Sequence, residues 1–374
     1  MKTRHRVVVD DARDLDRVDD DAVDLVVTSP PYPMIEMWDD LFADLDPDIE
    51  TYLAAGEGEA AFEAMHDALA PVWDELARVL TEGGIACINV GDATRTVGER
   101  FRVYQNHARV IEALTDRGFE PLPEILWRKP TNAAAKFMGS GMVPPNAYVT
   151  LEHEYVLVFR NGPRRAFEAG ADRRYEAAYF WEERNEWFSD LWTDVTGQLQ
   201  TLPDDALRER SGAYPLEIPY RLVNMYSVYG DTVLDPFWGT GTTTLAAMAA
   251  GRNSVGYELD SALVERFDDR LDRVPDLSER IARERLAAHR RFVERTREQG
   301  DTLDYDAVHY DTPVRTKQER NIRLYRAESI ERSGPARADT DGHTDGPADD
   351  PTESRTYRVT HVPVETDSSG DGTD

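Results

Sequence analysis

The chain has 374 residues, of which 40% are hydrophobic and 31% charged, and its formal net charge is −29. This composition supplies enough apolar surface for a packed interior and excludes a uniformly disordered chain. Only Lys2, Lys129, Lys136 and Lys317 are lysines, so 39 of the 43 basic residues are arginine. Because concentrated salt screens the repulsion between carboxylates, we expect such an acidic, lysine-poor protein in the cytosol of an extreme halophile.

Features that would place the chain outside the cytoplasm are not found in the sequence. The single cysteine, Cys87, cannot form an intramolecular disulfide and lies in an apolar run. No apolar stretch approaches the roughly 18 residues of a membrane span. The residues before Asp10 contain only three valines in a row and do not resemble a signal peptide. We therefore expect a cytoplasmic protein without a membrane anchor.

Short β-branched runs alternate with helical patterns, which predicts parallel βαβ units and an α/β fold with a doubly wound, mostly parallel sheet. Residues 62–80 place apolar side chains at spacings of three and four, and residues 242–250 are closed by Gly251, so both are expected to be helices. Strands are expected at residues 7–9, 25–28, 85–90, 155–159, 233–235 and 254–258.

Several stretches interrupt this alternation. Residues 33–60, 128–150 and 160–210 are expected to be recognition loops inserted into a catalytic domain of residues 1–275. Residues 276–332 are expected to form a charged helical extension, with its helix ending near residue 299. Gly, Pro, Asp, Thr and Ser dominate residues 333–374, which predicts a disordered acidic tail.

The segment Thr28–Tyr32 reads Thr-Ser-Pro-Pro-Tyr and follows the apolar run of residues 23–27. In an open parallel sheet, ligands bind at the carboxyl ends of strands. The two prolines hold the Ser29 hydroxyl and the Pro30 carbonyl as a rigid pair of acceptors, and Tyr32 offers a flat face. This arrangement suits a planar base with an exocyclic amino group. The alternative is a Pro-Pro turn that only ends a strand.

A second segment, residues 235–244, reads Asp-Pro-Phe-Trp-Gly-Thr-Gly-Thr-Thr-Thr and joins a strand to a helix. Its two glycines let a ligand approach the backbone. Seventeen residues after Gly241, Glu258 ends the next strand, where a ribose diol would be bound. The third glycine of a dinucleotide fingerprint and the Gly-Lys-Ser/Thr of a P-loop are both missing. The pattern favours a nucleoside cofactor over a plain turn.

Together the two segments resemble the amino-group DNA methyltransferases, in which an Asp-Pro-Phe-x-Gly-x-Gly loop binds S-adenosylmethionine and a Ser/Asp/Asn-Pro-Pro-Tyr/Phe motif binds the target base. The motif order resembles the circularly permuted beta class, and the resemblance covers roughly residues 5–275. Residues 91–92, 153–155 and 214–222 are similar to other motifs of the family, whereas Ser211-Gly212-Ala213 departs from its usual histidine. The resemblance implies a Rossmann-like methyltransferase fold.

The resemblance also implies the roles of individual residues. Ser29, rather than Asp, looks like the subgroup that methylates the 4-amino group of cytosine; adenine methylation is the rival, and a catalytically silent DNA-binding module is the alternative from another class. Methylation at the 5-carbon would need a cysteine nucleophile, and Cys87 lies in a predicted core strand. The implied catalytic residues are Ser29, Pro30, Pro31 and Tyr32, and the implied cofactor contacts are Asp235, Phe237, Gly239, Gly241, Thr242, Glu258, Asp260, Tyr214 and Pro215.

A base within a duplex must be flipped out to reach such a pocket, so double-stranded DNA and cations to hold it are implied. Arg128, Lys129 and Lys136 lie in a loop with glycine hinges that we expect to close on DNA. Further basic stretches occur at residues 160–165 and 173–174. His153 lacks neighbouring metal ligands, so no metal is expected. The resemblance is also compatible with a companion restriction endonuclease.

Overall fold

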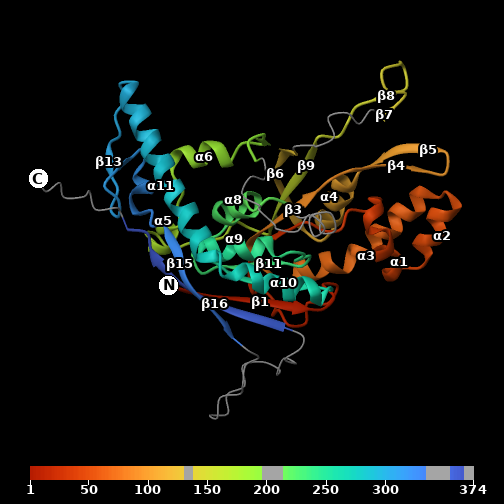
Figure 1. The fold of residues 1–374 in the computed structure, drawn as a ribbon, viewed down its shortest axis with the longest axis horizontal. Coiled ribbons are helices and arrows are strands. Elements are labelled where there is room, and N and C mark those ends of the chain that lie inside the picture. The colour runs from red at the N-terminus through yellow and green to blue at the C-terminus, as the bar shows by residue number, and fades with distance from the viewer. Residues whose placement is uncertain (130–137, 196–213, 334–353, 366–374) are drawn as a thin grey trace, which may run out of the picture.

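The structure, a computed structural model, describes residues 1–129, 138–195, 214–333 and 354–365. Within these residues ten of the strands form one sheet that is flanked by helices (Figure 1). No described helix is long and apolar enough to cross a membrane. In spatial order, the strands of the sheet are β10 (Leu191–Trp192), β6 (Phe119–Arg128), β9 (His153–Asn161), β3 (Leu80–Val90), β2 (Val23–Thr28), β11 (Thr232–Asp235), β12 (Asn253–Glu258), β1 (Lys2–Val9), β16 (Ser354–Pro363) and β15 (Tyr325–Ser333).

The centre of the sheet, β3-β2-β11-β12-β1, is parallel, whereas β9 and β16 run antiparallel to their neighbours. From β2 the chain proceeds outward to β3, but β11 returns to the other side of β2 and leads on to β12. The strand order therefore reverses between β2 and β11. Crevices at such a reversal, outside the carboxyl ends of the strands, are where ligands bind in open α/β sheets.

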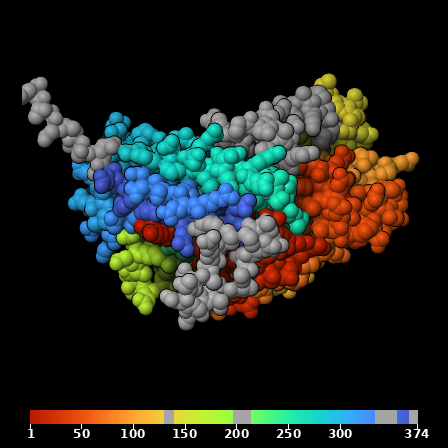
Figure 2. Space-filling view, turned by 60° about the horizontal axis from the view of Figure 1, so that its bottom comes forward, coloured from red at the N-terminus to blue at the C-terminus, as the bar shows by residue number. Residues whose placement is uncertain are grey.

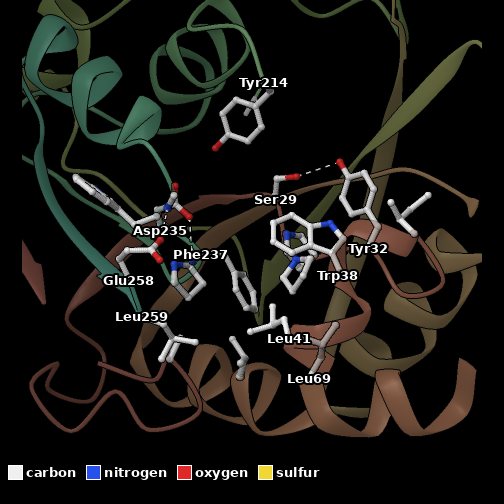
Figure 3. A pocket seen from close by; sticks show the side chains of 18 of the residues that line it. Ser29, Tyr32, Trp38, Leu41, Leu69, Tyr214, Asp235, Phe237, Glu258 and Leu259 are labelled. Carbon is white, nitrogen blue, oxygen red and sulfur yellow. Dashed lines mark hydrogen bonds between the residues drawn. The ribbon is translucent and has the colours of Figure 1, made fainter. Parts of the chain in front are cut away.

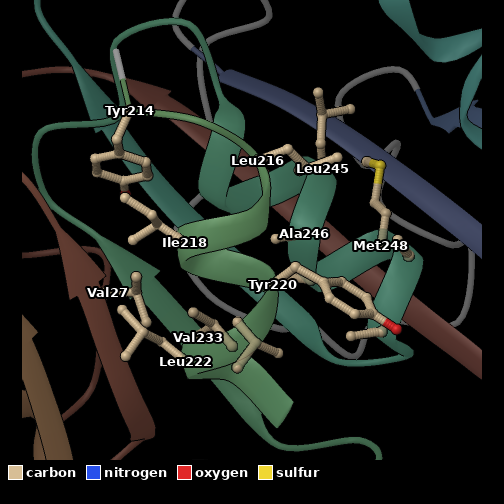
Figure 4. Packing of buried hydrophobic residues seen from close by; sticks show 14 of the residues in the cluster. Val27, Tyr214, Leu216, Ile218, Tyr220, Leu222, Val233, Leu245, Ala246 and Met248 are labelled. Carbon is tan, nitrogen blue, oxygen red and sulfur yellow. The ribbon is translucent and has the colours of Figure 1, made fainter. Parts of the chain in front are cut away.

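Helices cover both faces of the sheet, as a parallel sheet requires. One face is covered by α8, α9 and α11, and the other by α3 and α4. Figure 4 shows Val27 of β2 and Val233 of β11 beneath apolar side chains of α8 and α9. The helices are α1 (Asp39–Leu45), α2 (Asp48–Ala55), α3 (Gly58–Val79), α4 (Asn106–Asp116), α5 (Asp172–Glu176), α6 (Trp181–Trp187), α8 (Glu217–Tyr226), α9 (Thr242–Ala250), α10 (Ser261–Leu271) and α11 (Val274–Glu298), with 3-10 turns η1 (Glu36–Trp38) and η2 (Lys317–Asn321).

The predicted strands and the helices at 62–80 and 242–250 are all present, but residues 33–60 are not a loop. They form η1, α1 and α2 and lead into α3. Phe42 and Ile49 are 0% exposed and pack in the same core as α3. The helical spacing of the apolar residues is hard to recognise in the sequence, because many acidic residues lie between the few large apolar ones.

The expectation of disorder is wrong for part of the tail at residues 333–374. Ser354–Pro363 forms β16, which pairs with β1 and β15 inside the sheet. Tyr357 and Val359 are 0% exposed and point into the core, so the alternation of buried and outward side chains makes this segment a strand. In Figure 2 the blue C-terminal segment lies against the red start of the chain. Residues 334–353 and 366–374 lie outside the described part.

The other insertions and the extension are partly built into the core. Residues 160–195 contain α5, α6 and β10, and Trp187 and Trp192 are buried in the main core. Helix α11 spans the predicted charged helix and contributes Val274 to that core. Two hairpins stand off the sheet in Figure 1: β4 (Ala93–Val97) with β5 (Arg100–Tyr104), and β7 (Met138–Gly139) with β8 (Ala147–Tyr148). A third small pair is β13 (Tyr305–Asp306) with β14 (Pro313–Val314).

Candidate active site

The two sequence motifs meet at the reversal of strand order. The segment after β2 and the loop after β11 are joined by a hydrogen bond from Thr28 Oγ1 to Asp235 Oδ1 of 2.6 Å, although these residues are 207 positions apart. The bond is buried. Parallel pairing of β2 with β11 brings their carboxyl ends to the same edge, which explains this contact.

Both motifs line a single cavity of about 790 Å³ (Figure 3). Its volume lies in the range of small-molecule sites. Apolar side chains from the first insertion, including Trp38 and Leu41, form one wall. The predicted site residues that line this cavity are Ser29, Pro30, Pro31, Tyr32, Lys129, Tyr214, Asp235, Phe237, Gly239, Thr242, Glu258 and Asp260.

A hydrogen-bond network fixes the direction of the Ser29 hydroxyl. Tyr32 has one hydroxyl proton, which it donates to Glu154 Oε2 at 3.0 Å. Its oxygen accepts a bond of 2.8 Å from Asn89 Nδ2, so in its 3.0 Å contact with Ser29 the tyrosine oxygen also accepts. Ser29 therefore donates to Tyr32, and both lone pairs of the serine oxygen remain available as acceptors.

The carboxylate of Glu154 anchors this network. It accepts from Asn89 Nδ2 at 2.7 Å and from Lys129 Nζ at 2.6 Å, in addition to Tyr32. Burial, together with the nearby Glu154 carboxylate, raises the pKa of the Tyr32 phenol well above its ordinary value. The phenol thus keeps the proton that orients Ser29. Gly91 lies close to this ring, because a Cβ there would lie 3.1 Å from Tyr32 and the ring would have to shift by a few tenths of an ångström.

On the opposite side of the cavity, two carboxylates lie at the ends of β11 and β12. Asp235 Oδ1 accepts from the Phe237 amide at 3.2 Å, and Glu258 accepts from the amides of Gly239 at 2.7 Å and Asp260 at 2.9 Å. Burial raises the pKa of Asp235 to about 6 and that of Glu258 to about 7. Each carboxylate keeps lone pairs for a ligand, since two oxygens provide about four acceptor sites.

Other predicted contacts play different parts in the structure. Gly241 does not line the cavity: its φ is +75°, and a Cβ there would lie 2.6 Å from the Trp238 and Phe267 rings, so it permits packing at the start of α9. Pro215 is also outside the lining, whereas Tyr214 lines the cavity and its hydroxyl lies 2.6 Å from Thr243 Oγ1.

The three basic residues predicted to contact DNA differ in position. Lys129 reaches the cavity through its bond to Glu154. Arg128 is exposed and does not line the cavity, but it pairs at 3.1 Å with Glu152, which does. Lys136 lies outside the described residues, as does the departure at residues 211–213.

Sequence reasoning did not assign roles to Asn89 and Glu154. Asn89 is a lone polar side chain in the apolar run of β3, and Glu154 directly precedes the apolar residues of β9. A buried polar residue inside such a run was the available signal, because burial requires a hydrogen-bonding partner. Which partner it has depends on strand pairing, and β3 lies beside β9.

Three carboxylates come close together elsewhere among the described residues, at Glu186, Asp194 and Glu217. The Arg221 guanidinium binds all three of them. A cation is thus already supplied by the protein at this cluster.

Comparison with known proteins gives a consistent set of relatives. The N6_N4_Mtase family model, described as DNA methylase, matches residues 23–268. The chain is 50% identical over 328 residues to Type II methyltransferase M.MthZI of Methanothermobacter thermautotrophicus, covering 87% of this chain and 91% of the relative. It is 48% identical over 282 residues to Type II methyltransferase M.MjaI of Methanocaldococcus jannaschii, covering 72% and 92%.

A similar solved structure comes from Thermus thermophilus. This protein was assigned as a DNA modification methylase and crystallised with S-adenosyl-L-methionine. It has a TM-score of 0.56 and 31% identity, with 72% of this chain and 94% of that chain covered.

Proposed function

Since the chain belongs to the N6_N4_Mtase DNA methylase family, and is thus a DNA methyltransferase, we propose that it methylates the exocyclic 4-amino group of cytosine in DNA with S-adenosyl-L-methionine as donor. The observation that carries the proposal is the single cavity shared by the Ser29 segment and the Asp235 loop. The oxygen acceptors at Ser29 and Pro30 and the carboxylates of Asp235 and Glu258 line the same space, as methyl transfer between two bound groups requires.

The residues of the Asp235 side fit S-adenosyl-L-methionine. Glu258 ends β12 at the position where a carboxylate binds a ribose diol, and it retains free lone pairs after its two backbone bonds. Asp235 adds a second carboxylate, and Phe237 lines the cavity with its ring. The bound cofactor would supply an electrophilic methyl group on a cationic sulfur. A solved relative, the Thermus thermophilus protein, contains the same cofactor.

At the other side, the protein prepares the nucleophile. The amino nitrogen of cytosine is a poor nucleophile, because its lone pair is delocalised into the ring. The Ser29 oxygen, with both lone pairs available, and the Pro30 carbonyl would accept hydrogen bonds from this amine. Those bonds orient the nitrogen and localise its lone pair, so rate acceleration comes from positioning and electrostatics. No covalent intermediate with the protein is required.

The target base must leave the duplex to enter this cavity, at a cost of a few kcal/mol. The flat ring of Tyr32 lines the cavity and is proposed to contact the flipped base. Lys129 at the cavity and Arg128 beside it are proposed to contact the DNA backbone, with Lys136 from the same segment. The Type II names of the two archaeal relatives support a companion restriction endonuclease.

The choice of cytosine over adenine rests on Ser29, which resembles the cytosine-modifying subgroup. The test is to incubate unmethylated DNA with the enzyme and cofactor, digest it to nucleosides and identify the product by mass spectrometry. Detection of 4-methylcytosine supports the proposal, and 6-methyladenine alone refutes the base assignment while leaving methyl transfer intact. Cofactor binding without any methylated nucleoside would instead support a silent DNA-binding module.

A further inference from the structure

A second cavity, of about 970 Å³, lies at the opposite edge of the sheet from the candidate active site. It is lined by the start of β3, by the segment leading into β11 and by residues of the third insertion. Asp231, just before β11, belongs to this cavity, whereas Asp235, at the other end of β11, belongs to the first. Among the described residues, none lines both cavities.

Positive charge is concentrated in this second cavity although the chain carries −29 overall. Of its arginines, Arg160 pairs with Glu120 and Arg165 with Asp231. Within the described part of the chain, the other arginines of the lining have no carboxylate partner. They are Arg164, Arg174 and Arg184, and all three are exposed.

Among the described residues, the acidic residues of the lining form no ion pair with these three arginines. Asp231 is occupied by Arg165 at 2.7 Å and by Arg173 at 2.6 Å. Glu319 accepts from the backbone amides of Thr316 at 2.7 Å and Trp181 at 2.8 Å. Within the described part of the chain, the cavity therefore retains guanidinium groups that have no carboxylate partner.

Aromatic rings lie beside these cations. The guanidinium carbons of Arg165 and Arg174 lie 4.8 and 5.0 Å from the centre of the same ring, that of Phe167. Tyr175 and Tyr179 also line the cavity. Arg165 is paired with Asp231, so Arg174 is the cation at this ring that lacks a carboxylate partner among the described residues. Arginine forks bind phosphate oxygens in pairs, and aromatic faces stack on planar bases.

We propose that this second cavity is a binding site for a nucleoside phosphate, with Arg164 and Arg174 on the phosphate and the aromatic rings on the base. The proposal is independent of methyl transfer, because the site shares no described residue with the active site. The same chemistry occurs in a free nucleotide and at the end of a single strand of DNA, and the experiment separates these two sources.

Binding to the full-length chain is measured by calorimetry in saturating S-adenosyl-L-methionine, which fills the first cavity, with AMP, adenosine, inorganic phosphate and a short 5′-phosphorylated oligothymidylate. The test variant is Arg164→Gln with Arg174→Gln. The matched control is Arg295→Gln with Arg297→Gln, which removes the same charge from the last turn of α11. We expect AMP affinity to fall about tenfold or more in the test variant and to stay unchanged in the control, since each bond to a charged group contributes measurably.

Methyl transfer should be the same in both double variants, which separates this proposal from the proposed function. Equal AMP affinity in the test and control variants overturns the proposal. The proposal is also overturned if adenosine binds the parent chain as tightly as AMP does, or if inorganic phosphate fails to compete with AMP. Both measurements use the parent chain, so they do not depend on whether a variant folds. Tighter binding of the oligonucleotide than of AMP assigns the site to a DNA strand, and equal or weaker binding assigns it to a free nucleotide.

Discussion

The substitution Glu154→Gln tests whether the proton arrangement around Tyr32 is required for activity. In the parent chain, the Glu154 carboxylate receives the Tyr32 proton on one oxygen and the Lys129 ammonium on the other, at 3.0 and 2.6 Å. The ammonium favours a glutamine whose carbonyl faces Lys129, which turns the amide donors toward Tyr32. Asn89 Nδ2 still donates to Tyr32, so the phenol oxygen then faces amide donors from both Asn89 and the new glutamine.

Because amide donors then face the Tyr32 oxygen, the Tyr32 hydroxyl donates its hydrogen bond to Ser29 instead of to residue 154. The serine oxygen then accepts from Tyr32 and turns its own proton into the cavity, where it opposes the amine of the base. One acceptor bond to an amine that gains positive charge is lost, which costs about 1.5–3 kcal/mol. We expect kcat to fall about 10- to 150-fold, with cofactor affinity unchanged.

The assay is single-turnover methyl transfer from labelled S-adenosyl-L-methionine at saturating DNA. Glu112→Gln is the control, because Glu112 is an exposed carboxylate of α4 that pairs with Arg109 and does not line the cavity. In a Lys129→Met background the glutamine is free to keep its carbonyl on Tyr32, so the loss caused by Glu154→Gln should shrink. A loss of equal size in both backgrounds, or a rate equal to that of the control, would refute the reasoning.

Three further predictions concern the cofactor side and the fold. Burial raises the pKa values of Asp235 and Glu258 to about 6 and 7, so both carboxyl groups become negatively charged as the pH rises through this range. Affinity for the cationic cofactor, measured by calorimetry, should therefore increase between about pH 5.5 and 8. Glu258→Gln should flatten the upper part of this increase. A pH-independent affinity would contradict this. Gly241→Ala should lower the free energy of unfolding by about 1–3 kcal/mol in denaturant titrations, because φ is +75° and two rings lie within 2.6 Å of the new Cβ; an unchanged midpoint would contradict the packing role. Tyr357→Ala, which empties a fully buried position of β16, should cost about 3–5 kcal/mol, whereas a disordered tail would show no change.

Much of the site was predictable because its chemistry is local in sequence. The Ser29 and Asp235 segments each follow a strongly apolar strand, and parallel strands place such segments at one edge. Their adjacency required the strand order, in which β11 lies beside β2. Asn89 and Glu154 were not assigned because their roles arise from the pairing of β3 with β9, which no local pattern contains.

The errors in the fold have a common physical origin. Residues 33–60 and 354–363 are surrounded by acidic or small residues, so composition suggested that they could not pack. A few side chains were sufficient: Phe42 and Ile49 anchor the helices of the first segment, and Tyr357 and Val359 anchor β16. In a chain with so many surface carboxylates, average polarity is a poor guide to burial, and the spacing of the few large apolar residues is the better one.

The pairing of β16 with β1 constrains how the molecule can be made. The Met1 amino group donates to the His361 carbonyl at 3.0 Å, so a strand synthesised 360 positions later closes on the first. Until β16 has left the ribosome, the outer edge of β1 lacks the strand that covers it. A nascent chain, or one that ends before β16, would expose this edge to other chains, and open edges of this kind promote aggregation. We therefore expect β16, once synthesised, to protect the edge of β1 from pairing with other chains.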